Sequence, residues 1–205
     1  MVFRCDRHID IIVNNYRKGT AAPQWSSRAA IDYAQGASRM SRPTAPRAVT
    51  VYFSLEGNVR HLAQAVATAV DSPLVEVLPA EPRRGAEVTE YVWGDTRIIC
   101  PEMPELLPLS LNPDDFDLIF LGSPVWKGTV APAMRSFLAA GDFYRKKVAL
   151  FCAYSGRAGG YFEQAEQLLL GCEIIDTIGF REPLRFSRQK SARDIAAWAK
   201  SVMAR

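Results

Sequence analysis

The sequence predicts an α/β fold built on an open, doubly wound parallel sheet, and two observations support this prediction. From residue 48 onward, segments of strand length alternate with segments whose apolar residues recur at helical spacing. The strand segments are almost continuously apolar, which is typical of strands buried on both faces beneath layers of helices. A doubly wound, three-layer arrangement satisfies both observations.

Five strands are expected. AVTVYF (48–53) is a run of β-branched and apolar residues, and LVEVL (74–78) is a second run of this kind. FDLIFLGSP (116–124) is nearly continuous in apolar residues. The remaining two strands are KKVALFCAY (146–154) and EIIDTIGF (173–180).

Four helices are expected between and after these strands, and they cover residues 58–70, 131–140, 161–170 and 191–204. In the last of them, Ile195, Trp198 and Val202 recur at the spacing of one helical face. Residues 80–115 interrupt the alternation, because they hold five prolines and no clear amphipathic helix. A segment of this length without regular structure is usually functional, so we expect it to form a lid over a site.

The first 47 residues form a separate, basic region with eight Lys or Arg against three Asp or Glu. Apolar residues at helical spacing predict helices over 5–19 and 26–40, followed by a proline-containing linker at 41–47. The expected organisation is therefore an N-terminal helical arm (1–47) and an α/β domain (48–205). The arm could pack on the domain, hold a homodimer together or remain disordered.

Composition excludes several classes of function. No stretch approaches the roughly 20 apolar residues of a membrane span, and no signal peptide is evident, which indicates a cytoplasmic protein. The basic arm lacks the interleaving of aromatic and basic residues that would favour nucleic-acid binding. Cys5 and His8 form only half of a metal site, and the four cysteines show no pairing pattern. No nucleophile–base–carboxylate set is visible, because His61 lies on an exposed helix face.

Ligands of open α/β sheets bind beyond the carboxyl ends of the strands. Three loops rich in glycine, hydroxyl and aromatic residues follow the first, third and fourth strands, and they cover 54–59, 123–128 and 154–161. The first offers helix N-terminal amides to a phosphate. The second presents Trp126 as a platform for a planar ring, and the glycines of the third allow close backbone approach. Together these loops predict a site for a planar, phosphorylated cofactor.

The segments YFSLEGNVRHLAQAV, FDLIFLGSPVWKGTVAPAMRSFL and KKVALFCAYSGRAGGYFEQ resemble the flavodoxin-like proteins, which bind FMN. The resemblance covers about residues 48–204 and implies a five-stranded parallel sheet of order 2-1-3-4-5, as in flavodoxin. It also implies that the cofactor-binding residues are Ser54, Leu55, Glu56, Gly57, Asn58, Val59, Trp93, Ser123, Pro124, Val125, Trp126, Lys127, Gly128, Ala153, Tyr154, Ser155, Gly156, Gly159, Gly160 and Tyr161. No catalytic residue and no metal are implied.

Two residues depart from the S-x-T-G-N-T phosphate loop of this family, since Glu56 and Val59 each replace a threonine. The leading expectation is an FMN protein that passes electrons between redox partner proteins or to a small acceptor. The first alternative is an FMN-dependent NAD(P)H oxidoreductase that reduces a quinone or similar acceptor. The second is a flavin-free binding module that keeps the fold.

Overall fold

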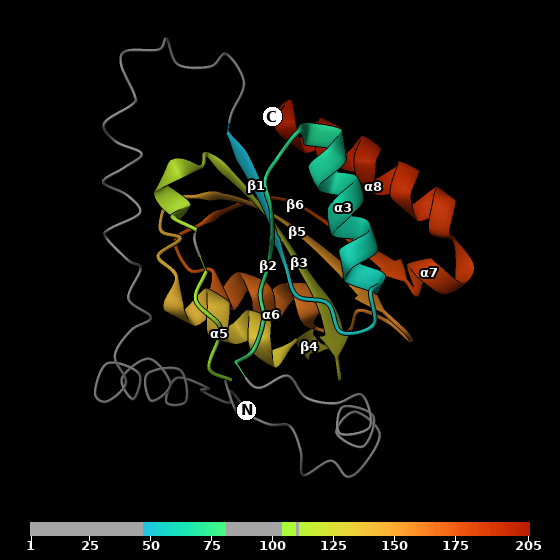
Figure 1. Ribbon diagram of the computed structural model, residues 1–205, viewed down its shortest axis with the longest axis horizontal. Helices are drawn as coiled ribbons and strands as arrows, with labels where there is room; N and C mark the ends of the chain where they lie inside the picture. Colours follow the sequence, from blue (N-terminus) through green and yellow to red (C-terminus); the bar gives the residue numbers. More distant parts are fainter. Residues whose placement is uncertain (1–46, 81–103, 110) are drawn as a thin grey trace, which may run out of the picture. The chain divides into compact units, whose positions relative to one another are not determined.

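The computed structural model describes residues 47–80, 104–109 and 111–205 (Figure 1). Contacts within the chain divide it into two units, residues 1–39 and 40–205, and the described residues all belong to the second. The expected helices at 5–19 and 26–40 lie outside the described residues, as do Trp93 and most of the expected lid. Their roles remain predictions.

The sheet has the predicted strand order. Its strands are β1 (Ala48–Tyr52), β2 (Leu74–Glu76), β3 (Leu118–Trp126), β5 (Lys147–Tyr154) and β6 (Glu173–Arg181), arranged β2-β1-β3-β5-β6. All four pairings along this path are parallel. Counted in chain order, the five expected strands therefore pair as 2-1-3-4-5, which confirms the expected topology.

The sequence predicts that the third strand ends at residue 124, and this boundary is wrong. The strand continues to Trp126 and then turns back through Lys127 and Gly128 into a short antiparallel strand, β4 (Thr129–Val130). Lys127 and Gly128 have φ angles of 50° and 79°. Positive φ at both central residues is the geometry of a two-residue turn whose twist matches that of the flanking strands. Part of the expected second loop is therefore a β-hairpin.

Helices cover both faces of the sheet, as a doubly wound fold requires (Figure 1). α3 (Asn58–Val70) and α8 (Arg188–Met203) pack on one face, and α5 (Pro132–Ala140) and α6 (Tyr161–Leu168) pack on the other. Two short helices are additional to the expected ones: η1 (Pro113–Asp115) and α7 (Pro183–Phe186). Within the described residues, no helix has the length and apolarity needed to cross a membrane.

The sheet residues divide between two cores according to the alternation of side chains along each strand. Val49 and Val51 of β1 contribute to the core beneath α5 and α6, whereas Ala48 and Tyr52 contribute to the core beneath α3 and α8. Thr50 is also fully buried, and its hydroxyl is 2.8 Å from that of Ser72. Burial of both faces of β1 explains why its sequence is almost continuously apolar, with Thr50 as the polar exception.

Gly122 of β3 is a packing constraint at the centre of the sheet. It pairs with Phe151 of β5, and a Cβ atom at position 122 would lie 2.2 Å from Phe151 Cζ. Phe151 is fully buried, so its ring has little freedom to move away. Glycine at this position leaves the space that the aromatic ring fills.

Gly122→Ala is expected to destabilise the fold by about 1–3 kcal/mol, because the added methyl group overpacks a rigid core. Urea denaturation followed by circular dichroism measures this loss. Gly156→Ala is the matched control, since a Cβ there meets nothing within 4 Å. Equal unfolding midpoints for the two variants would contradict the proposed packing constraint.

Candidate functional site

Three chain segments meet at one edge of the sheet because their strands are neighbours. Tyr52 of β1 pairs with Gly122 of β3, and Gly122 pairs with Phe151 of β5. The residues that follow these positions therefore leave the sheet at the same edge. We call them the first loop (54–59), the second segment (123–128) and the third loop (153–161).

The first loop presents an uncapped helix N-terminus. Gly57 precedes α3 with φ 85° and ψ −10°, a left-handed conformation that glycine adopts without steric cost. No side chain accepts a hydrogen bond from the first turn of α3, and that turn contains no acidic residue. The free amides and the positive end of the helix dipole together suit an anionic group.

Ser54 adds a second, independent sign of a ligand at this loop. Its side chain is only 8% exposed, and its Oγ has no hydrogen-bond partner in the described part of the chain. A buried hydroxyl without a partner costs roughly 1–3 kcal/mol, so such groups are rare in native structures. A polar ligand group at the start of α3 would satisfy it.

The other residues of the first loop have different roles. Glu56 is exposed, and Leu55 is partly buried. Val59 is 1% exposed and packs in the core beneath α3, so its side chain does not line the loop. Asn58 Oδ1 accepts a hydrogen bond from Leu184 N (3.2 Å), which ties the loop to α7.

The second segment holds an aromatic side chain beside a rigid backbone. Trp126 is partly buried and packs edge-on against Phe53, with ring centroids 5.9 Å apart at 79°. Thr129 Oγ1 donates a hydrogen bond to the carbonyl oxygen of Trp126 (2.8 Å), which fixes the hairpin. Pro124 and Val125 are partly buried β3 residues. The indole is thus held in place at the edge of the sheet.

Ser123 supports this segment from within the fold. Its side chain is fully buried, and its hydroxyl donates to the carbonyl oxygen of Pro124 (3.0 Å) and accepts from Ala131 N (3.3 Å). These contacts join β3 to the start of α5. The structure therefore gives Ser123 protein partners and places its hydroxyl inside the core.

The third loop meets the second segment backbone to backbone. A Cβ atom at Gly159 would lie 2.8 Å from Gly128 Cα, and Gly159 has φ 60°. The structure therefore shows a close approach of two backbones at Gly159 and Gly128. The expected approach of the third-loop glycines to a ring stays a prediction. Ser155, Gly156 and Gly160 are exposed.

The ends of the third loop lie deeper in the fold. Ala153 is buried, Tyr154 is partly buried, and both belong to β5. Tyr161 is 2% exposed, and its hydroxyl is 3.5 Å from the carbonyl oxygen of Phe151, to which it donates. Burial holds the pKa of Tyr161 well above its usual range. Tyr161 therefore supports the loop from beneath as a neutral core residue.

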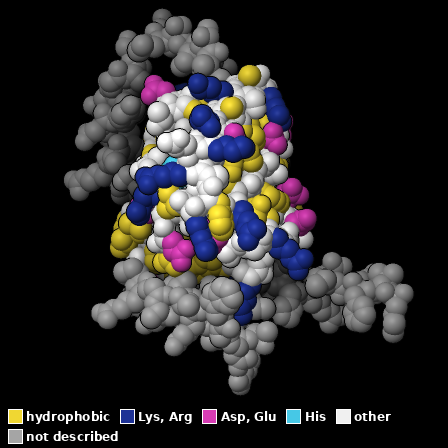
Figure 2. Space-filling view, turned by 90° about the vertical axis from the view of Figure 1, so that its right-hand side faces the viewer, with side chains coloured by type: hydrophobic (Ala, Val, Ile, Leu, Met, Phe, Trp, Pro, Cys, Tyr) yellow, Lys and Arg dark blue, Asp and Glu magenta, His cyan; other side chains and the backbone are white. Residues whose placement is uncertain are grey.

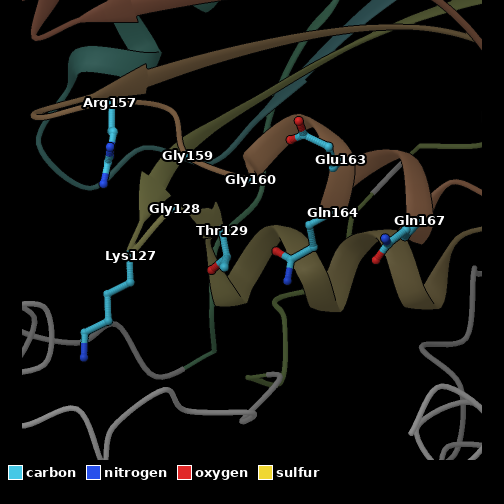
Figure 3. Close-up of a pocket in the computed structure, with 9 residues that line it drawn as sticks. All are labelled: Lys127, Gly128, Thr129, Arg157, Gly159, Gly160, Glu163, Gln164 and Gln167. Carbon is cyan, nitrogen blue, oxygen red and sulfur yellow. The ribbon is translucent and has the colours of Figure 1, made fainter. Parts of the chain in front are cut away.

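A groove of about 620 Å³ runs beside the second segment and the third loop (Figure 3). Its lining residues are Lys127, Gly128, Thr129, Arg157, Gly159, Gly160, Glu163, Gln164 and Gln167. In Figure 3, Lys127 and Arg157 lie on one side, and the Glu and Gln side chains of α6 lie on the other. Within the described residues neither cation forms an ion pair.

Five of these lining residues are additional to the expected site: Thr129, Arg157, Glu163, Gln164 and Gln167. Glu163 and Gln167 are four residues apart on α6, so they lie on one helix face. This spacing could have been recognised in the sequence. Gln164 also holds the hairpin, since its Oε1 accepts from Val130 N (2.8 Å). The described residues contain no group of three or more His, Cys, Asp or Glu that could hold a metal ion.

Cys152 lies beneath this edge of the sheet as a buried, neutral thiol. It is fully buried, and desolvation raises its pKa to about 12 from an ordinary value near 9. At neutral pH the thiol is therefore protonated and is not a nucleophile.

Stability should fall as pH rises from about 9 to about 12, because the unfolded chain releases the Cys152 proton at the lower pH and the folded chain at the higher. Below pH 9 the Cys152 thiol makes its full contribution to the unfolding free energy. In Cys152→Ala, unfolding free energy measured by urea titration should decline less steeply over this range. Tyr161, whose pKa is also raised, should keep part of the decline. Parallel pH profiles for the variant and the wild type would refute this assignment.

The fold is shared with solved flavoproteins. A flavoprotein from Lactobacillus acidophilus NCFM, solved in complex with FMN, aligns with 23% identity and a TM-score of 0.54, over 68% of this chain and 95% of the other. A flavoprotein from Bacteroides uniformis ATCC 8492 aligns with 21% identity and a TM-score of 0.63, over 77% of this chain and 99% of the other. A flavoprotein from Bacteroides eggerthii DSM 20697 aligns with 20% identity and a TM-score of 0.62, over 78% of this chain and 99% of the other.

At these identities the solved structures show likeness of fold. Among curated proteins, none matches the sequence. A family model described as flavodoxin matches residues 47–201, which is most of the chain and includes all three segments of the site. The chain therefore belongs to the flavodoxin family.

Proposed function

We propose that the protein binds FMN at the carboxyl ends of β1, β3 and β5 and carries electrons between redox partners. The observation that carries this proposal is the unpartnered, buried Ser54 Oγ beside the uncapped N-terminus of α3. Membership of the flavodoxin family supports the same assignment. So does the FMN in the Lactobacillus acidophilus flavoprotein, whose fold this chain shares.

The first loop would hold the phosphate. Ser54 Oγ and the first-turn amides of α3 are donors without protein acceptors among the described residues, and the helix dipole favours a dianion there. Gly57 lets the backbone enter α3 without a side chain in the way. Because Glu56 is exposed, its charge lies on the solvent side of the loop.

The second segment and the third loop would hold the flavin ring. Trp126 offers an indole that packs on Phe53, and Thr129 holds the backbone of Trp126. The Gly128–Gly159 contact brings two backbones together in the same segments. Lys127, Ser155, Gly156 and Gly160 are exposed along the same edge. When bound, FMN would supply reversible electron transfer, while these residues bind and orient it.

Ser54→Ala should weaken FMN binding about tenfold or more, because a hydrogen bond to a charged acceptor contributes roughly 1.5–3 kcal/mol. Titration of the flavin-free full-length chain with FMN, followed by quenching of flavin fluorescence, measures the Kd. Ser136→Ala is the matched control, since Ser136 Oγ is also buried and without a partner in the described residues but lies on α5. Its Kd should equal that of the wild type.

Equal Kd values for the Ser54 and Ser136 variants would show that the first loop does not hold the phosphate. A wild-type chain that binds no FMN would refute the proposed function and favour the flavin-free binding module.

The groove beside the second segment favours a second candidate function, an FMN-dependent NAD(P)H oxidoreductase. Its volume of about 620 Å³ leaves room for part of a dinucleotide next to the ring loops. Lys127 and Arg157 line it as cations without ion-pair partners in the described residues, and such cations suit the phosphates of NAD(P)H.

This second function predicts that NADPH alone bleaches the bound flavin without oxygen, and that Arg157→Ala slows bleaching several-fold while leaving the Kd for FMN unchanged. Stopped-flow absorbance of the FMN-loaded protein follows the reaction. Lys200→Ala, at the distant end of α8, is the control with the same loss of charge. Flavin that stays oxidised in the presence of NADPH would exclude this candidate and leave the electron carrier.

A further inference from the structure

The short helix α7 connects the last strand of the sheet to two of the three site segments. Leu184 N donates to Asn58 Oδ1 (3.2 Å), and Leu184 Cδ1 lies 3.5 Å from the position that a Cβ on Gly57 would take. Just before α7, Arg181 Nε donates to the carbonyl oxygen of Ser155 (3.0 Å) in the third loop. The surface of α7 is therefore contiguous with the proposed cofactor site.

An exposed aromatic ring stands on this surface between two guanidinium groups. Phe186 is 57% exposed, with the guanidinium carbons of Arg181 and Arg185 at 5.4 Å and 5.0 Å from its ring centroid. Cation–π contacts of this kind hold a ring in one orientation while leaving it accessible. Aromatic and Arg side chains are the types most enriched where protein partners bind tightly.

The charge around Phe186 is strongly positive. Residues 181–190 contain Arg181, Arg185, Arg188 and Lys190 against a single acid, Glu182. Glu182 lies 3.6 Å from Arg185, yet the Arg185 side chain remains 72% exposed. Figure 2, which faces the side carrying α3, α7 and α8, shows Lys and Arg side chains spread over this surface.

We propose that the α7 patch, defined as Arg181, Arg185, Phe186 and Arg188, is the docking surface for an acidic redox partner protein. The proposal rests on the proposed electron-carrier function and names the class of partner for that site. A cationic rim steers an acidic protein toward its target, and the exposed Phe186 supplies a central apolar contact. Docking there places the partner against the first and third loops.

A protein fits this patch better than a nucleic acid or an anionic membrane. Glu182 pairs with Arg185 and Asp194 pairs with Lys190, so acidic groups interrupt the cations. A phosphate backbone or a lipid surface presents a continuous row of negative charge and would meet these acids. A folded protein surface can present carboxylates at chosen positions and avoid them.

Isothermal titration calorimetry of the full-length chain with an acidic ferredoxin as the probe tests the docking surface. The wild type should bind at low ionic strength and lose affinity as salt is added. Arg185→Glu/Arg188→Glu should raise the Kd about tenfold or more, because both side chains would then repel the probe. Arg145→Glu/Lys200→Glu changes the net charge equally but lies away from α7, and its Kd should change less than threefold.

Phe186→Ala tests the aromatic contact separately from the charges and should raise the Kd severalfold. Tyr144→Ala is its control, since Tyr144 is 63% exposed and also carries one cation–π contact, from Arg145, but precedes β5 at the opposite edge of the sheet. Thermal melts followed by circular dichroism establish that each variant is folded.

Three results would overturn the proposal. The first is an equal Kd for the patch and control charge variants. The second is tighter binding to basic cytochrome c than to the ferredoxin. The third is patch-dependent binding to duplex DNA or to phosphatidylserine vesicles without binding to the ferredoxin. Because calorimetry needs no bound flavin, failure of docking and failure of FMN binding are separate observations.

Discussion

Parallel pairing of β1, β3 and β5 sets the positions of all three segments of the proposed site. The register that joins Tyr52, Gly122 and Phe151 brings three loops to one edge, although they are about 70 and 30 residues apart in sequence. Gly122 makes this register possible, because Phe151 occupies the space of its missing side chain. A shift in either pairing would separate the uncapped start of α3 from Trp126 and from the groove.

Much of this arrangement could be predicted from the sequence. Continuous apolar strands and alternating amphipathic segments are strong local signals, and they led to the correct fold class. The correct strand order was implied by the resemblance to flavodoxin-like proteins. The three segments at the carboxyl edge follow from that order. The turn at Gly57 could be predicted because a strand–glycine–helix turn has a specific backbone geometry that depends on few distant contacts.

Other features depend on contacts that a single sequence does not reveal. Val59, Ser123 and Tyr161 lie within the expected cofactor segments, yet their side chains are buried beneath the loops. The Ser123 hydroxyl forms a hydrogen bond with Ala131 N there. The close approach of Gly159 to Gly128 is a further contact of this kind. The Lys127–Gly128 turn had a readable signal, since two residues between β-branched runs favour a hairpin. The contact of α7 with Asn58 joins residues 126 positions apart, and no local sequence pattern indicates it.

Two-dimensional ¹H–¹⁵N NMR of the flavin-free protein can show whether the phosphate of FMN binds at the first loop, as we propose. Riboflavin shares the ring and ribityl chain of FMN but lacks the phosphate. FMN should shift the amide resonances of Gly57, Asn58 and Val59, whereas riboflavin should leave them nearly unchanged. Equal shifts with both ligands, or no shift at these amides with FMN, would contradict this proposal.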